Sequence, residues 1–244
     1  HYGKVAAACA AAFLLPFALT FGPGTAASLV VHTLVAEYIP FVLLLTALFA
    51  ATGGIHIKGN LHGTPAVNTG LLAAGAGMAS VMGTTGASML LIRPLLRAND
   101  ARRYRAHVVV FFIFLVANIG GSLTPLGDPP LFLGYLRGVP FTWTLRLWPY
   151  WVAVNGTLLI IYCIWDRIMH RREPVRALIS DETQVRPLRV TGLVNIPLIL
   201  GVVLAVAFLV PGKPFLGTAF IPPVFFREVV MLMLVVLSLH VTRS

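Results

Sequence analysis

An acidic residue lies in an apolar part of the chain, within a segment whose residue types disfavour a helix. Residues 118–136 read NIGGSLTPLGDPPLFLGYL and contain four glycines, three prolines and Asp128. Glycine disfavours a helix and proline removes an amide donor, so we expect the helix that enters this segment to break. A broken helix exposes unpaired carbonyls and amides at its ends. Carbonyls and the Ser122 and Thr124 hydroxyls suit a hard cation such as sodium, and Asp128 would add negative charge.

Long apolar blocks surround this segment and determine the class of protein. The chain is 58% hydrophobic and only 11% charged, whereas a soluble domain carries about 25% charged residues. The apolar blocks are residues 5–22, 39–54, 106–117, 147–165, 192–210 and 228–241. A membrane-spanning helix needs roughly 17–25 such residues, a length that two of the blocks reach unaided. The sequence therefore predicts an all-α polytopic membrane protein.

The positions of the basic residues in the loops account for the net charge of +10. Most of the basic residues fall in two short loops, at residues 97–105 and 167–189. Positive charge in short loops marks the cytoplasmic side, so nucleic-acid binding is not needed to explain the charge. With both loops inside, residues 39–54 run inward, and an external stretch containing Glu37 precedes them. Residues 106–136 run outward, and residues 147–165 return.

The segment at about 64–97 does not fit a simple crossing, because Lys58 and residues 97–105 are both placed inside. Its return arm, residues 87–96, has ten residues and covers roughly 15 Å, half of the ~30 Å hydrocarbon core. We therefore predict a re-entrant hairpin that turns at GTTGAS, residues 83–88. The alternative is a pair of slightly kinked ordinary helices. Non-helical backbone at this depth must be buried in protein or line a wet cavity.

The broken helix at about 106–136 would begin at the cytoplasmic face, break at Gly120 and Gly121, and finish as a short arm over residues 131–136. Asp128 could simply cap this arm, since Asp before Pro is a favourable N-cap. However, an ionisable group inside the membrane is by default a functional candidate, and the two roles can coexist. We expect the other acids to lie in loops or at helix ends: Glu37, Asp100, Asp166, Glu173, Asp181, Glu182 and Glu228.

Other polar and aromatic residues suggest ordinary roles. His107 stands near a helix end, where an interfacial position is expected. Asn68, on the first hairpin arm, could line a cavity or hydrogen-bond to a neighbouring helix. Trp143, Trp148, Tyr150 and Trp151 are typical of an aromatic belt at the outer interface. We find no metal-ligand cluster, nucleotide loop or nucleophile–base pair, so the sequence predicts neither an enzyme nor a bound cofactor.

Two motifs carry a resemblance to a known family. NIGGSLTPLGDPP resembles the unwound-helix motif of the ion transporter superfamily, in which a similar string lies in the fifth helix. MGTTGASMLLIRP stands where that family has its first hairpin tip. The tip reads Gly-Thr-Thr here, whereas the family often has Ser-Asn-Thr, so the carboxylate-binding signature is not intact. Over essentially all 244 residues, the chain looks most like citrate-transporter-like proteins that include bacterial sodium/proton antiporters.

The resemblance implies two inverted repeats, each with a hairpin and a broken helix around a central site. Residues 1–165 would be the first repeat, residues 166–190 a cytoplasmic linker, and residues 191–244 the start of a truncated second repeat. This chain is then expected to be a fragment that holds one half-site. The residues carried over to an ion or substrate site are Thr84, Thr85, Ser88, Asn118, Ser122, Thr124, Gly127 and Asp128.

The predicted function is secondary active exchange of sodium for protons across the bacterial inner membrane, in a chain embedded in lipid that could pair as a homodimer. The residues expected to hold sodium are Thr84, Ser122, Thr124 and Asp128. Burial raises the pKa of a carboxyl group and a nearby cation lowers it, so one acid can make the two ions compete. Alternatives on the same scaffold are sodium-coupled transport of citrate or a dicarboxylate and efflux of an arsenite-type oxyanion. A non-transporting membrane subunit or a channel is a further alternative.

Overall fold

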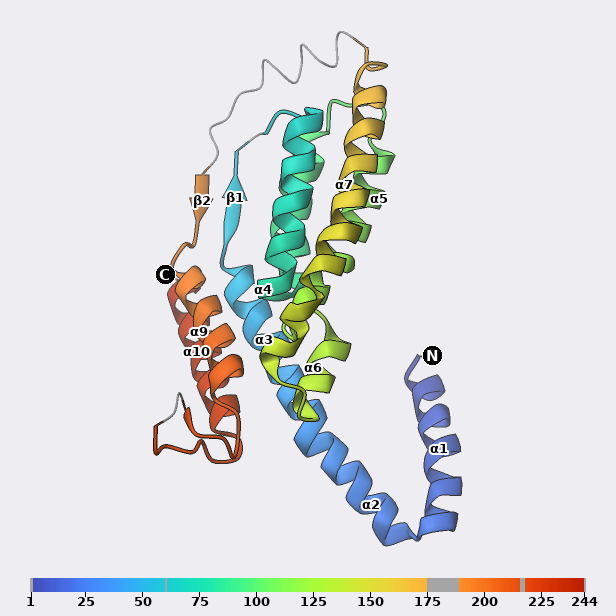
Figure 1. Ribbon diagram of the computed structural model, residues 1–244, viewed down its shortest axis with the longest axis vertical. Coiled ribbons are helices and arrows are strands. Elements are labelled where there is room, and N and C mark those ends of the chain that lie inside the picture. The colour runs from blue at the N-terminus through green and yellow to red at the C-terminus, as the bar shows by residue number, and fades with distance from the viewer. Residues whose placement is uncertain (1, 60, 175–188, 216–217, 244) are drawn as a thin grey trace. The chain divides into compact units, whose positions relative to one another are not determined.

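The computed structural model describes residues 2–59, 61–174, 189–215 and 218–243, and these are almost entirely helical (Figure 1). Five helical stretches are long and apolar enough to cross a membrane. The chain is therefore an all-α polytopic membrane protein, as predicted. It forms two compact units, His1–Val42 and Leu43–Ser244.

Consecutive helices make up the first unit and lead into the second. Helix α1 spans Tyr2–Phe21, α2 spans Pro23–His32, and a π-helical turn over Thr33–Tyr38 leads into α3, Ile39–Gly53. Residues 23–53 are thus continuously helical. Glu37, which was expected in a loop or at a helix end, therefore lies inside this continuous helix. Pro23 occupies the first turn, where proline is tolerated, and no second proline follows before residue 40 to stop the helix.

Helix α4, Pro65–Ala98, is the predicted hairpin. Its backbone is helical except at Gly83, where φ is 80° and ψ is 154°. Asn68 Nδ2 donates to Asn99 Oδ1 over 2.8 Å, so the two ends of α4 meet. The turn is narrower than predicted, because residues 84–88 already belong to the return helix. The return arm, residues 84–98, covers about 22 Å and so remains shorter than the hydrocarbon core.

The predicted break in the next helix is also present. Helix α5 spans Ala106–Leu115, a 3₁₀ turn spans Ile119–Leu123, and α6 spans Pro129–Leu136. A second 3₁₀ segment, Phe141–Leu147, leads into α7, Trp148–His170, which runs alongside α4 and α5 (Figure 1). Helix α7 is five residues longer at its end than the predicted span, 147–165.

The rest of the second unit contains two short strands that the sequence did not predict. Strand β1, His56–Lys58, pairs antiparallel with β2, Arg189–Thr191. Helices α9, Asn195–Phe208, and α10, Phe226–Arg243, pack together, and Ser238 Oγ donates to Asn195 Oδ1 over 2.8 Å. Of the predicted linker, residues 175–188 lie outside the described residues, residues 166–170 are the last turn of α7, and residues 189–190 belong to β2. The division into two repeats stays a prediction.

Small residues let the hairpin and the broken helix approach closely. A Cβ atom placed on Gly120 would lie 2.7 Å from Ala76 Cα, and one on Gly75 would lie 2.6 Å from Val116 Cγ2. Both distances are too short for a side chain, so these glycines are required by packing. Leu72, Leu115, Val116 and Tyr162, which are fully buried, form the apolar core around this contact.

Candidate ion-binding site

The tip of the hairpin meets the break in the next helix. A Cβ atom on Gly83 would lie 3.4 Å from Leu126 O, and one on Gly121 would lie 2.6 Å from Thr84 Cγ2. Thr84 N also donates to Gly127 O over 3.4 Å. Two segments that lie far apart in the chain are thus in direct contact at their two non-helical points.

Hydroxyl groups and one indole fix this contact. Ser80 Oγ donates to Gly120 O over 2.5 Å, and Thr124 Oγ1 donates to Ser80 O. Leu126 N donates in turn to Thr124 Oγ1 over 3.2 Å. Trp151 Nε1 donates to Gly120 O over 3.0 Å. The Gly120 carbonyl therefore has two protein donors, and the break is held in one conformation by groups from α4 and α7.

Asp128 occupies the N-cap position of α6 without capping it. Its backbone is extended, with φ −140° and ψ 130°, and Pro129 and Pro130 follow. The backbone oxygen of Asp128 accepts from the amides of Leu131 and Phe132, but its side chain makes no capping hydrogen bond. Within the described part of the chain, the partly buried carboxylate has no hydrogen-bond or ion-pair partner. The purely capping role is therefore not supported.

The remaining predicted residues differ in how close they lie to this contact. Thr84, Thr124 and Gly127 come together at the tip, and Ser122, whose Oγ donates to Ile119 O over 2.8 Å, lies next to Gly121 in the 3₁₀ turn. The structure does not bring the other three predicted residues into it. Thr85 is exposed, Asn118 is exposed and donates to Ile113 O over 2.8 Å, and Ser88 has a buried Oγ with no partner among the described residues.

Comparison with known proteins gives one match. A family described as "Putative citrate transport" matches residues 1–244. The chain belongs to this citrate-transport family. No curated protein and no solved structure matches it. Its helices and its family together make it a multi-pass membrane transporter, and membership of a transport family favours a protein that is not an enzyme.

This member of the citrate-transport family also contains a buried polar cluster that sequence reasoning missed. Asp166, expected near a loop, is fully buried in the last turn of α7. Its carboxylate accepts from Arg102 Nη2 over 2.6 Å, from Asn68 Nδ2 over 3.2 Å and from Tyr162 OH over 3.1 Å. His107, at the start of α5, is 9% exposed and its Nε2 lies 2.9 Å from the same group, so its side chain faces the protein interior.

Glu173 extends this cluster beyond the end of α7. Its carboxylate accepts from the backbone amides of Arg103 and Tyr104 over 2.9 Å and 2.8 Å. Glu173 was expected to be an ordinary loop acid, but it is buried. These bonds join the loop after α4 to the loop after α7, the two basic loops that were both predicted to lie inside. The only signal in the sequence for this contact was the prediction that both loops lie on the cytoplasmic side.

Two further residues of this citrate-transport family member have partners that the sequence did not indicate. Trp151 was assigned to an aromatic belt at the outer interface, but its indole is partly buried and donates a hydrogen bond to Gly120 O at the break. Glu228 lies at a helix end, as expected, in the first turn of α10, but it is buried there and Arg227 Nε donates to it over 3.0 Å. Arg227 Nη1 also donates to Tyr135 OH over 3.2 Å, which links α10 to α6.

Proposed function

We propose that this transporter exchanges sodium for protons and that Asp128 is the group for which the two ions compete. The observation that supports this proposal is the carboxylate without a partner among the described residues, one residue beyond the contact between Gly127 and the hairpin tip. A bare carboxylate inside a membrane costs at least ~2.5–3.5 kcal/mol at the centre of a helix. A bound proton or a bound cation removes that cost.

The neighbouring groups suit a cation. The hydroxyl oxygens of Thr84, Ser122 and Thr124 lie on the hairpin tip and on the break, and each hydroxyl has acceptor lone pairs. Sodium would bind to the deprotonated carboxylate with such oxygens, and a proton would displace it. Exchange follows because one site cannot hold both ions, and movement of the hairpin against the outer helices would expose the site to each side in turn.

The test is Asp128→Asn in the full-length protein, reconstituted in proteoliposomes. Asparagine keeps the size of the side chain but cannot titrate. We expect sodium-driven proton movement to be lost and the remaining sodium binding to become nearly independent of pH. In the unsubstituted protein, sodium binding should rise with pH, because only the deprotonated acid attracts the cation.

The matched control is Asp100→Asn. Asp100 is an exposed loop acid that pairs with Arg105 at 2.7 Å, and its substitution should leave exchange unchanged. If Asp128→Asn inserts normally and retains both exchange and its pH dependence, the proposal is wrong and the proton is carried elsewhere.

Sodium-coupled transport of citrate is the second candidate, and the description of the family favours it. The same proteoliposomes distinguish the two. Uptake of labelled citrate that follows an imposed sodium gradient supports the second candidate, whereas sodium-driven proton flux without citrate supports exchange.

A further inference from the structure

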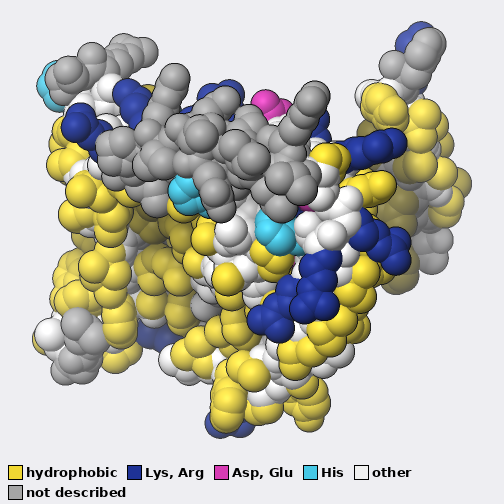
Figure 2. Space-filling model, turned by 90° about the horizontal axis from the view of Figure 1, so that it is seen from above, with side chains coloured by type: hydrophobic (Ala, Val, Ile, Leu, Met, Phe, Trp, Pro, Cys, Tyr) yellow, Lys and Arg dark blue, Asp and Glu magenta, His cyan; other side chains and the backbone are white. Residues whose placement is uncertain are grey.

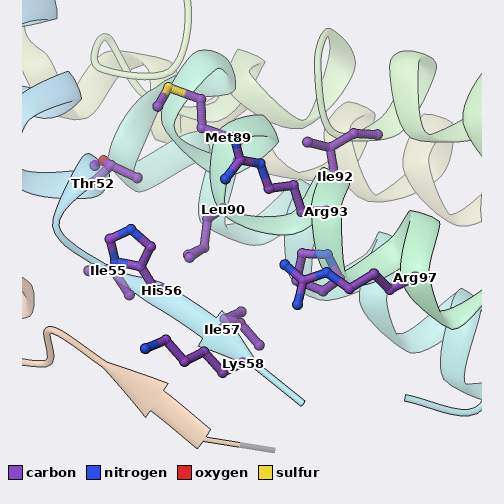
Figure 3. A pocket seen from close by; sticks show the side chains of 12 residues that line it. Thr52, Ile55, His56, Ile57, Lys58, Met89, Leu90, Ile92, Arg93 and Arg97 are labelled. Atoms are coloured by element: carbon purple, nitrogen blue, oxygen red, sulfur yellow. The ribbon is translucent and has the colours of Figure 1, made fainter. Parts of the chain in front are cut away.

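A basic pocket lies against the return arm of the hairpin. Its volume is about 390 Å³, and it is enclosed by the end of α3, by β1 and by the return arm of α4 (Figure 3). Gly86 of the return arm packs against Thr52 of α3, one of the lining residues: a Cβ atom on Gly86 would lie 2.8 Å from Thr52 Oγ1. The pocket does not include the residues of the candidate ion site.

Local geometry brings four basic side chains to this pocket. Arg93 and Arg97 are four residues apart on the return helix, so they share one face. His56 and Lys58 are two residues apart on β1, so they share one face of the strand. Figure 3 shows the two guanidinium groups extending from the helix toward the side on which the strand lies.

The charge of this pocket is not neutralised by the part of the protein that the structure describes. None of the twelve lining residues is acidic. The side chains of Lys58, Arg93 and Arg97 make no ion pair or hydrogen bond with the described residues. Among the described residues visible from the end where α4 and α7 meet their loops, Figure 2 shows more Lys and Arg side chains than Asp and Glu side chains.

The pocket also has an apolar wall. Met89 and Ile92 lie on the return helix beside the arginines, and Ile55 and Ile57 contribute from the strand side. Met89 is 41% exposed, so the apolar lining continues to the outer surface of the unit. A ligand that matches both parts must carry a negative head and an apolar body.

We propose that this pocket binds the headgroup phosphate of an anionic phospholipid. Basic pockets between membrane helices on the cytoplasmic side are suited to such headgroups. The topology predicted from the basic loops places Lys58 and Arg97 on that side. The phosphate would lie among Arg93, Arg97, Lys58 and His56, and an acyl chain would run along Met89 and Ile92. The lipid would then brace the return arm of the hairpin against α3.

The experiment is native mass spectrometry of the protein in detergent micelles, titrated with phosphatidylglycerol or with phosphatidylcholine. The protein should retain phosphatidylglycerol preferentially. A cation near an anionic lipid contributes about a fivefold gain in affinity. Arg93→Gln/Arg97→Gln should therefore weaken phosphatidylglycerol binding about 25-fold. Lys58→Gln, which leaves the hairpin helix unchanged, should weaken it about fivefold.

The control is Arg171→Gln/Arg172→Gln, which removes two exposed arginines from the end of α7 on the same predicted side. It should bind phosphatidylglycerol like the unsubstituted protein. Equal losses in this control and in the pocket variant would show that only the general charge of this side matters, and would overturn the proposal. Binding of free citrate or inorganic phosphate that depends on Arg93 and Arg97, without preference for phosphatidylglycerol, would overturn the lipid as the source of the anion.

Discussion

Gly83 provides the sharpest test of the hairpin, because its backbone conformation is one that other residues rarely adopt. At φ 80° and ψ 154°, a residue with a side chain is strained by about 1–3 kcal/mol. A Cβ atom there would lie 3.4 Å from Leu126 O and 3.7 Å from Leu48 Cδ1, which is ordinary contact. Gly83→Ala should therefore destabilise the protein through its backbone and not through a clash.

Gly77→Ala is the same chemical change in a different setting. Gly77 lies within the first arm of α4 and is exposed, and a Cβ atom on it would have no neighbouring atom within 4 Å. Alanine is favoured over glycine in a helix by about 0.8–1 kcal/mol. Gly77→Ala should therefore stabilise the protein, and the free energies of unfolding of the two variants should differ by roughly 2–4 kcal/mol.

The assay is equilibrium unfolding in mixed detergent micelles, with the fluorescence of the four tryptophans as the signal. The comparison is between the two variants, so detergent effects common to both cancel. If Gly83→Ala proves as stable as Gly77→Ala, residue 83 does not require glycine. The chain would then not turn back at this residue, and the contact between the hairpin tip and Leu126 would have to be abandoned.

Two further predictions concern the buried cluster and the topology. Asp166→Ala leaves the buried Arg102 and His107 without their shared acid, so the free energy of unfolding in the same assay should fall by about 3–5 kcal/mol. Adding Arg102→Met should recover part of this loss, and the absence of any recovery would contradict the pairing of Arg102 with Asp166. In a Cys9→Ser/Cys163→Ser background, Arg103→Cys should be protected from impermeant thiol reagents added outside intact cells, while Lys213→Cys should react. External labelling at position 103 would refute the inside assignment of both basic loops.

The broken helix was predictable from local backbone chemistry, whereas the hairpin was predicted from the basic residues that flank it and from the shortness of its return arm. Gly120, Gly121 and the three prolines of residues 118–136 weaken a helix, so the sequence located that break. Gly83, the only non-helical residue within α4, lies in the stretch 83–88 where the hairpin was predicted to turn. The width of the turn was less accurate. Thr84 and Thr85 have no strong local preference against a helix, and the return helix begins at Thr84 as soon as the chain has turned.

The partners of each polar group could not be predicted in the same way. Asp166 follows a long apolar block, so its charge alone suggested that the helix ends before it. The structure instead continues α7 to His170, because Asn68 and His107 from other helices and Arg102 from the loop after α4 satisfy the carboxylate. The hydrogen bond of Trp151 could not be predicted for the same reason, since its indole reaches Gly120 O only after α7 packs beside the break.

The sequence by itself determined that this protein is helical, spans a membrane, and interrupts two of its helices, because composition and the backbone preferences of glycine and proline act locally. Only the tertiary structure decided that the two interruptions touch and that Asp128 lacks a partner there among the described residues. It also decided that Arg93, Arg97, His56 and Lys58 gather at one pocket. These are contacts between distant segments, and they depend on how helices pack and on which buried groups can pair with each other.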